Sequence, residues 1–200
     1  STLVGCRIPG NKLAKKLITL LDLPIAAPSA NLSERTSVTN IMDIDPILVK
    51  KIFVLKDKQS SHGLESTVVR IDTNNEIEVL RYGSITVEEL NKYAKVKIKK
   101  KSSISPGNLK KHYSTLKPIR MNAKRILKNE GLLNFGNNKL KSKIINLNLS
   151  NKKNLNEAAK NFYHYLHKLD QSRCKKIAVV EIPDKGLGKT INDRLRRAIK

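Results

Sequence analysis

The amino-acid sequence predicts an α/β protein with two units joined by a linker. Over residues 1–98, short apolar runs of strand length alternate with segments of helical periodicity, which is the pattern of α/β folds. From residue 99 to residue 118 this periodicity disappears and Lys, Ser, Pro and Gly dominate, as is typical of a linker. Residues 119–200 return to alternating patterns. We therefore expect a twisted sheet with flanking helices, followed by a small Rossmann-like α/β domain.

The first unit opens with a predicted strand, a helix and a second strand. Residues 2–8 form an apolar run, and residues 9–11, Pro-Gly-Asn, supply a turn and a helix cap. Leucines then recur at helical spacing from residue 13 until Pro24 ends the helix. We expect residues 23–27 to form the end of a buried strand.

Three further apolar runs predict strands at residues 51–55, 66–71 and 76–81. The last two flank residues 72–75, Asp-Thr-Asn-Asn, whose side chains favour a turn, so we expect a hairpin. A short helix is predicted at residues 41–44 and should end near Pro46. Thr86, with Glu89 three positions later, predicts a helix start with a capping box.

Helical and strand patterns alternate again in the second unit. We expect helices at residues 123–129, 155–169 and 190–199, and strands at residues 143–147 and 176–182. The middle helix carries a clear apolar stripe, formed by Ala158, Ala159, Phe162, Tyr165, Leu166 and Leu169. This stripe predicts that the helix packs against the core of the domain.

Composition and length indicate a globular protein. Two hundred residues, of which 39% are hydrophobic, suffice for a core. No apolar run approaches the roughly 20 residues that span a bilayer, and the start lacks signal-peptide features, so we expect a soluble cytoplasmic protein. We expect Cys6 and Cys174 to be small buried side chains in a reducing compartment, without a disulfide framework or a cysteine metal site.

The chain is strongly basic, with 40 Lys and Arg against 17 Asp and Glu and a formal charge of +23. Residues 1–117 contribute +9 (20 basic, 11 acidic), and residues 118–200 contribute +14 (20 basic, 6 acidic). Such a field attracts polyanions such as ATP and RNA. The five Tyr and three Phe form no stacking pattern, so the charge does not predict sequence-specific RNA recognition.

The loop that follows residues 23–27 is rich in small polar side chains. It reads Ala-Pro-Ser-Ala-Asn-Leu-Ser over residues 27–33, and Ser37 and Thr39 follow. Loops at strand ends are where α/β proteins place their ligands, and hydroxyl and amide groups bind phosphates well. The alternative is an ordinary turn whose side chains satisfy one another.

Five blocks of the chain, in order, resemble the threonylcarbamoyl-AMP synthases, also called the YrdC-like family, in their long form with a C-terminal domain. The blocks are Pro28-Ser29-Ala30-Asn31; residues 63–69; residues 80–85; Ser105-Pro106-Gly107 with His112-Tyr113; and Gly186-Leu187-Gly188 with residues 192–195, Arg197 and Ala198. The resemblance implies that residues 1–98 are the C-terminal part of a YrdC-like catalytic domain with an incomplete twisted sheet. Residues 99–118 would then be a linker that closes over the nucleotide as a lid, or else a mobile tether, and residues 119–200 the C-terminal domain.

The resemblance also implies an enzyme, an L-threonylcarbamoyladenylate synthase, which is a nucleotidyltransferase of tRNA modification. L-Threonine and bicarbonate give a carbamate whose oxygen attacks the α-phosphate of ATP, and pyrophosphate leaves. ATP is thus a substrate, Mg²⁺ neutralises its phosphates, and a downstream tRNA threonylcarbamoyl transferase complex receives the product. This chemistry depends on positioning and charge neutralisation more than on a general base, so no catalytic residue is assigned.

Matching positions imply the site residues. The ATP-binding roles fall on Ser29, Asn31, Ser37, Arg81, His112 and Tyr113. The threonine-binding roles fall on Arg7, Ala27 and Ser66, and a guanidinium grips a carboxylate bidentately. The plainer alternatives are a surface ion pair for Arg7, a strand-forming role for Ser66 and a solvated edge position for Arg81.

The sequence departs from the family pattern at several positions. Glu34 stands where the family has glycine, Val38 where it has proline, and Ser114 where alanine and proline follow His-Tyr. No Lys-x-Arg motif precedes the first expected strand. We therefore expect the chain to be the C-terminal portion of a longer or split gene product that binds ATP weakly and turns over poorly alone. A non-catalytic RNA-binding or regulatory module is the alternative.

Two other motifs suggest competing chemistry. Residues 186–190, Gly-Leu-Gly-Lys-Thr, end like a phosphate-binding P-loop, but Pro183 stands where the first glycine of that motif belongs. His164 and His167 lie three apart on one expected helix, a spacing that suits a metal, yet no cysteine or carboxylate partner accompanies them in the sequence. We expect neither a P-loop nor a metal site.

Overall fold

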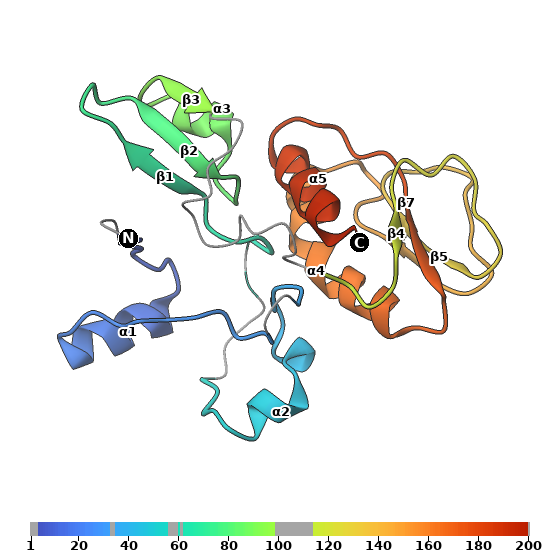
Figure 1. Cartoon of the computed structure of the whole chain (residues 1–200), viewed down its shortest axis with the longest axis horizontal. Helices are drawn as coiled ribbons and strands as arrows, with labels where there is room; N and C mark the ends of the chain where they lie inside the picture. The colour runs from blue at the N-terminus through green and yellow to red at the C-terminus, as the bar shows by residue number, and fades with distance from the viewer. Residues whose placement is uncertain (1–3, 33–34, 56–59, 61, 99–113, 200) are drawn as a thin grey trace.

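The computed structural model of the chain contains two sheets with associated helices (Figure 1) and confirms the predicted α/β class. The structure describes residues 4–32, 35–55, 60, 62–98 and 114–199. The helices are Lys12–Leu21 (α1), the 3₁₀ turn Ile41–Asp43 (η1), Pro46–Val49 (α2), Val87–Leu90 (α3), Leu155–Gln171 (α4) and Leu187–Ala198 (α5). The strands are Val68–Ile71 (β1), Ile77–Arg81 (β2), Val96–Ile98 (β3), Ile119–Arg120 (β4), Glu130–Asn134 (β5), Asn146–Asn148 (β6) and Lys176–Val179 (β7).

The smaller sheet has the order β1-β2-β3 and confirms the predicted hairpin. β1 and β2 run antiparallel, with Val69 opposite Val79, and β3 joins β2 in parallel. The turn between β1 and β2 forms because Asp72 Oδ1 accepts hydrogen bonds from the backbone N–H groups of Asn74 and Glu76, each at 2.9 Å.

Side-chain caps confirm two predicted helix starts. At α1, Asn11 Oδ1 accepts a 2.9 Å hydrogen bond from the backbone of Ala14. At α3, Thr86 Oγ1 accepts from the backbone of Glu89 at 3.2 Å, and Glu89 Oε2 accepts from the backbone of Thr86 at 2.7 Å. This reciprocal pair is the predicted capping box.

The larger sheet is parallel and has the order β4-β7-β5-β6. Helix α4 packs against β5 and against α5. The predicted apolar stripe of α4 faces the core, with Ala158, Ala159, Phe162, Leu166 and Leu169 all buried. Tyr165 is only half-buried, and the neighbouring Tyr163 is fully buried instead. The main core of the described chain therefore lies in this second unit.

Residues 4–55 bury few side chains. α1 buries none, and its leucines Leu13, Leu17, Leu20 and Leu21 are exposed. The predicted strands at residues 2–8, 23–27 and 51–55 are wrong, because the described parts of these runs pair with no described strand. An apolar run has strand propensity, but a strand also needs a partner for its backbone groups. Figure 1 shows α1, in blue, apart from both sheets.

The predicted helix at residues 123–129 is also wrong. This segment forms turns between Asn122 at φ 55° and Asn129 at φ 67°, both in the left-handed region that an α-helix excludes. A buried carboxylate stabilises the turns, since Glu130 Oε2 accepts a 2.8 Å hydrogen bond from the backbone of Leu127.

Smaller corrections concern single positions. Cys6 is exposed and not buried, whereas Cys174 is buried as expected. The short helix predicted at residues 41–44 is the 3₁₀ turn Ile41–Asp43, which ends before Pro46 as expected; Pro46 then begins α2, because proline suits the first helical turn. β6 begins at Asn146, later than predicted. None of the helices in the described part of the chain is long and apolar enough to cross a membrane.

Candidate functional site

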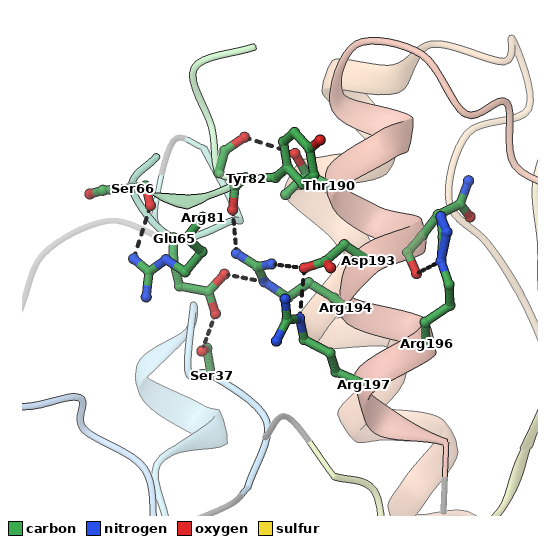
Figure 2. Close-up of polar contacts among 12 residues, drawn as sticks. Ser37, Glu65, Ser66, Arg81, Tyr82, Thr190, Asp193, Arg194, Arg196 and Arg197 are labelled. Atoms are coloured by element: carbon green, nitrogen blue, oxygen red, sulfur yellow. Dashed lines mark hydrogen bonds and ion pairs between the residues drawn. The ribbon is translucent and has the colours of Figure 1, made fainter. Parts of the chain in front are cut away.

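Ser66 lies between two arginines from distant parts of the chain. Its hydroxyl accepts a 3.3 Å hydrogen bond from Arg7. Its carbonyl oxygen accepts a 2.9 Å hydrogen bond from Arg81 (Figure 2). The hairpin explains the second contact, because its register places Arg81 opposite Val68, two residues after Ser66. Two guanidinium groups beside a hydroxyl suit a carboxylate or a phosphate. The structure thus brings together three of the predicted site residues.

Glu65 connects a fourth predicted residue, Ser37, to this group. The hydroxyl of Ser37 donates a short hydrogen bond to Glu65 Oε1, and Glu65 is the residue directly before Ser66 (Figure 2). The second unit contributes two further donors to the same carboxylate. Tyr163 of α4 donates from its hydroxyl at 2.6 Å, and Arg194 of α5 donates from Nε at 3.0 Å.

The donors around Glu65 keep its carboxylate charged. Burial raises the pKa of Glu65, but the Arg194 guanidinium and the hydroxyls of Ser37 and Tyr163 together hold this pKa below its ordinary value. A carboxylate with a lowered pKa and three donors is a poor general base at neutral pH. Glu65 therefore supports neighbouring groups and does not itself move a proton.

Gly83 allows the segment after Arg81 to approach Ser66 closely. A Cβ at residue 83 would lie 2.2 Å from the backbone nitrogen of Thr67 and 2.3 Å from the carbonyl carbon of Ser66, so a larger residue does not fit. The carbonyl oxygen of Gly83 also accepts a 3.0 Å hydrogen bond from Thr190 of α5 (Figure 2). The tight backbone packing holds the Arg81 segment against both Ser66 and the second unit.

The remaining predicted site residues do not contact this group in the described part of the chain. Ala27 and Ser29 are exposed. Asn31 donates to the backbone carbonyls of Leu32 and Arg35 at 2.9 and 3.1 Å, so its amide supports its own loop. His112 and Tyr113 lie outside the described residues.

Asn31 lines a separate cavity of about 290 Å³ between its loop and helix α4. The described walls of this cavity do not include Ser37, Ser66 or Arg81. Asn31 therefore lies beside a cavity separate from the group around Ser66, and its part in ATP binding stays a prediction.

The competing motifs have ordinary structural partners. A Cβ at Gly188 would lie 2.0 Å from the carbonyl oxygen of Pro183, and the backbone N–H of Gly186 donates to Glu88 at 3.4 Å. A carboxylate at this position disfavours a phosphate. Each histidine of α4 contacts the first unit: His164 Nδ1 lies 3.0 Å from a carboxylate oxygen of Asp43, and His167 Nε2 lies 3.0 Å from the Thr36 hydroxyl.

Sequence reasoning missed Glu65, Tyr163 and Arg194 as site residues. Glu65 and Arg194 lie inside the blocks that resemble the family, but neither was predicted to be a site residue. A signal existed for Arg194, because it shares a helix face with Ile191 and Ala198, which are both buried. A charged residue on an apolar helix face usually has a partner of opposite charge.

The described residues contain no preformed cluster of metal ligands. No group of three or more His, Cys, Asp or Glu side chains among them could hold a metal ion. The carboxylate of Glu65, the residue directly before Ser66, accepts hydrogen bonds from Arg194, Ser37 and Tyr163. Mg²⁺ prefers free carboxylate oxygens and phosphates, so no step is assigned to this ion.

Two family models match the chain. Residues 1–83 match the model described as telomere recombination, and residues 85–199 match the model described as the C-terminal domain of threonylcarbamoyl-AMP synthase. The second match alone covers more than half of the chain.

Curated relatives carry the name threonylcarbamoyl-AMP synthase. The protein of Pyrococcus abyssi is 26% identical over 98% of this chain and 63% of its own length. The protein of Bacillus subtilis is 28% identical over 98% of this chain and 62% of its own length. The protein of Schizosaccharomyces pombe is 35% identical over 54% of this chain and 30% of its own length. The chain thus spans less than two thirds of the length of these relatives.

Solved structures share the fold. The crystal structure of Pyrococcus abyssi Sua5 complexed with L-threonine matches with a TM-score of 0.81 at 25% identity, over 96% of this chain and 62% of that one. A doubly substituted variant of the same protein matches with a TM-score of 0.74 at 24% identity, over 96% of this chain and 60% of that one.

Proposed function

We propose that this chain, which belongs to the threonylcarbamoyl-AMP synthase family, acts in the formation of threonylcarbamoyl-AMP from L-threonine, bicarbonate and ATP for tRNA modification. The observation that carries this proposal is the convergence of Arg7 and Arg81 on Ser66. The similar Pyrococcus abyssi protein was crystallised as a complex with L-threonine, which supports the same substrate for this chain.

The proposed roles follow from the chemistry of these groups. The amine of L-threonine and bicarbonate give a carbamate and water, a carbamate oxygen attacks the α-phosphate of ATP, and the bond to pyrophosphate breaks. Arg7 and Ser66 would bind the threonine carboxylate, and Arg81 the AMP moiety. Ser37 is oriented by Glu65 and would bind the nucleotide with Ser29 and Asn31. Holding two charged reactants in line is the main contribution of such a site.

The chain would divide into three parts with separate roles. Residues 1–98 would supply this site as part of a YrdC-like domain, residues 99–118 would link the two units and cover the nucleotide, and residues 119–200 would form the C-terminal domain. A downstream tRNA threonylcarbamoyl transferase complex would receive the product.

Calorimetric titration of the 200-residue chain with L-threonine tests the proposal, together with pyrophosphate release from ATP in the presence of bicarbonate. We expect Arg7→Met and Ser66→Ala to weaken L-threonine binding at least tenfold, because each removes a group that would bind the threonine carboxylate. Arg173→Met, which changes an exposed arginine after α4, is the matched control and should stay within twofold of the wild type. Absence of L-threonine binding to the wild type, or equal binding by all variants, would overturn the proposal.

The alternative is a non-catalytic RNA-binding module, favoured by the charge of +14 on residues 118–200. Binding of tRNA measured between about 50 and 200 mM salt separates the two functions, because phosphate contacts lose affinity steeply with salt. Salt-dependent tRNA binding without L-threonine binding would favour the alternative.

A further inference from the structure

We infer that Arg194 of α5 is a positioning residue of the proposed substrate site, through which the second unit fixes the positions of Ser37, Ser66 and Arg81. This inference rests on the proposed function of that site. It assigns the C-terminal domain a part in building the site, although none of its described residues is proposed to touch a substrate.

Arg194 is buried and contacts both units. Its side chain has 0% exposure, and its guanidinium donates to Glu65 Oε2 at 3.0 Å and to the Tyr82 carbonyl oxygen at 2.6 Å. A third contact, to Asp193 Oδ2 at 2.5 Å, comes from the adjacent residue of the same helix. Figure 2 shows the guanidinium pointing from α5 toward Glu65 and Tyr82.

The two inter-unit partners of Arg194 are direct neighbours of proposed site residues. Glu65 precedes Ser66, and Tyr82 follows Arg81. Ser37 is connected as well, because its hydroxyl donates to Glu65. One guanidinium therefore fixes the spacing between the Ser66 and Arg81 segments and, through Glu65, the orientation of Ser37.

Stability alone does not explain this arginine. A buried ion pair contributes little net stability, because desolvation offsets much of the attraction, and apolar residues of similar volume often replace such pairs without loss. A planar guanidinium, however, donates in fixed directions to two partners at once, which neither methionine nor the single ammonium of lysine reproduces. The fixed directions in which the guanidinium donates its hydrogen bonds are thus the property that the site requires.

Four variants of the 200-residue chain separate positioning from stability. Arg194→Met removes the guanidinium, and Arg194→Lys keeps the positive charge but not the planar guanidinium. Glu65→Gln/Arg194→Met removes both charges, so no unpaired buried charge destabilises the fold. Arg196→Met is the matched control, because Arg196 lies on the same helix, is 53% exposed and faces away from Glu65 (Figure 2).

Two readouts are measured on every variant: amide hydrogen exchange of residues 64–68 and 81–84 without ligand, and L-threonine affinity by calorimetry. We expect exchange in both segments to become at least tenfold faster, and affinity to fall at least tenfold, in Arg194→Met, Arg194→Lys and the double variant. Small displacements of a site cost large factors in binding and rate. The Arg196→Met control should stay within twofold in both readouts.

Wild-type exchange and affinity in the folded double variant, or in Arg194→Lys, would overturn the inference, because charge or packing alone would then suffice. If Arg194→Met does not fold, these two variants decide the question. If the wild type binds no L-threonine, the proposed function fails, while the exchange rates still show whether Arg194 fixes the two segments.

Discussion

Gly63 lies directly against helix α4, where a Cβ at residue 63 would come within 2.2 Å of the carbonyl oxygen of Ala159. The backbone of Gly63 has a φ of +66°, in the left-handed region that favours glycine. Two residues later, Glu65 meets Tyr163, one helical turn after Ala159. The close approach of Gly63 therefore sets the distance at which the first unit packs on the second.

We expect Gly63→Ala to destabilise the protein by about 2–4 kcal/mol, from the strained φ and from a collision with helix backbone that cannot move aside. Urea unfolding followed by circular dichroism measures the change. Gly10→Ala is the matched control, since Gly10 is exposed and a Cβ there meets nothing within 4 Å. Equal unfolding midpoints for the two variants would contradict the packing described for Gly63.

Asn154 caps the long helix α4. Its Oδ1 accepts hydrogen bonds from the backbone N–H groups of Asn156 at 2.8 Å and Glu157 at 3.1 Å. We expect Asn154→Ala to lower the free energy of unfolding by about 1 kcal/mol, because these N–H groups lose their partner. Asn154→Asp retains an acceptor and favours the helix dipole, so its thermal unfolding should match or exceed that of the wild type. A wild-type midpoint for the alanine variant would show that the cap contributes nothing.

The sequence predicts best those elements whose signal is local. The stripe of α4 encodes its buried face, Asp72 encodes the hairpin turn, and Thr86 with Glu89 encodes the start of α3, so all three were confirmed. Runs 2–8, 23–27 and 51–55 carry strand propensity but no information on a partner strand, and their assignment failed. β4 was missed because a strand of two residues is too short to show an alternation of apolar and polar side chains.

Some residues of the candidate site could be predicted from the sequence, and others could not. Arg7, Ser37, Ser66 and Arg81 were named through the resemblance, because they lie in recognisable blocks. The pair formed by Glu65 and Arg194 is separated by 129 positions and depends on Gly63, which lets the first unit approach helix α4. Single-sequence periodicity carries no information on such packing, so the residues that organise the site were the ones missed.

Glu130 should make the second unit sensitive to acid. Its carboxylate, 1% exposed, accepts from Arg120 Nε at 2.9 Å, and the hydrogen bonds and charge of Arg120 lower its pKa despite burial. A carboxyl with a lowered pKa in the fold stabilises the protein above its ordinary value of 4.5, and this contribution is lost as pH falls through the lowered pKa. We expect urea midpoints to fall below pH 4.5, and to fall less steeply in Glu130→Gln.

The control for this pH series is Glu181→Gln, which changes an exposed carboxylate of the same unit. Its midpoints should follow the wild-type curve. Parallel curves for Glu130→Gln and the wild type would contradict the assigned role of Glu130.

Tyr163→Phe tests the connection between α4 and Glu65 without removing a ring from the core. The variant loses the 2.6 Å hydrogen bond to Glu65 Oε1, and a hydrogen bond to a charged group is worth roughly 1.5–3 kcal/mol. Removing this donor also raises the pKa of Glu65 toward its ordinary value, so the loss should be full at pH 7 and shrink as the carboxyl is protonated below pH 4.5. Urea unfolding at several pH values measures both effects, with Tyr165→Phe, a half-buried tyrosine of the same helix, as control. A loss that stays constant with pH would place the contribution of Tyr163 in packing and not in its bond to the carboxylate.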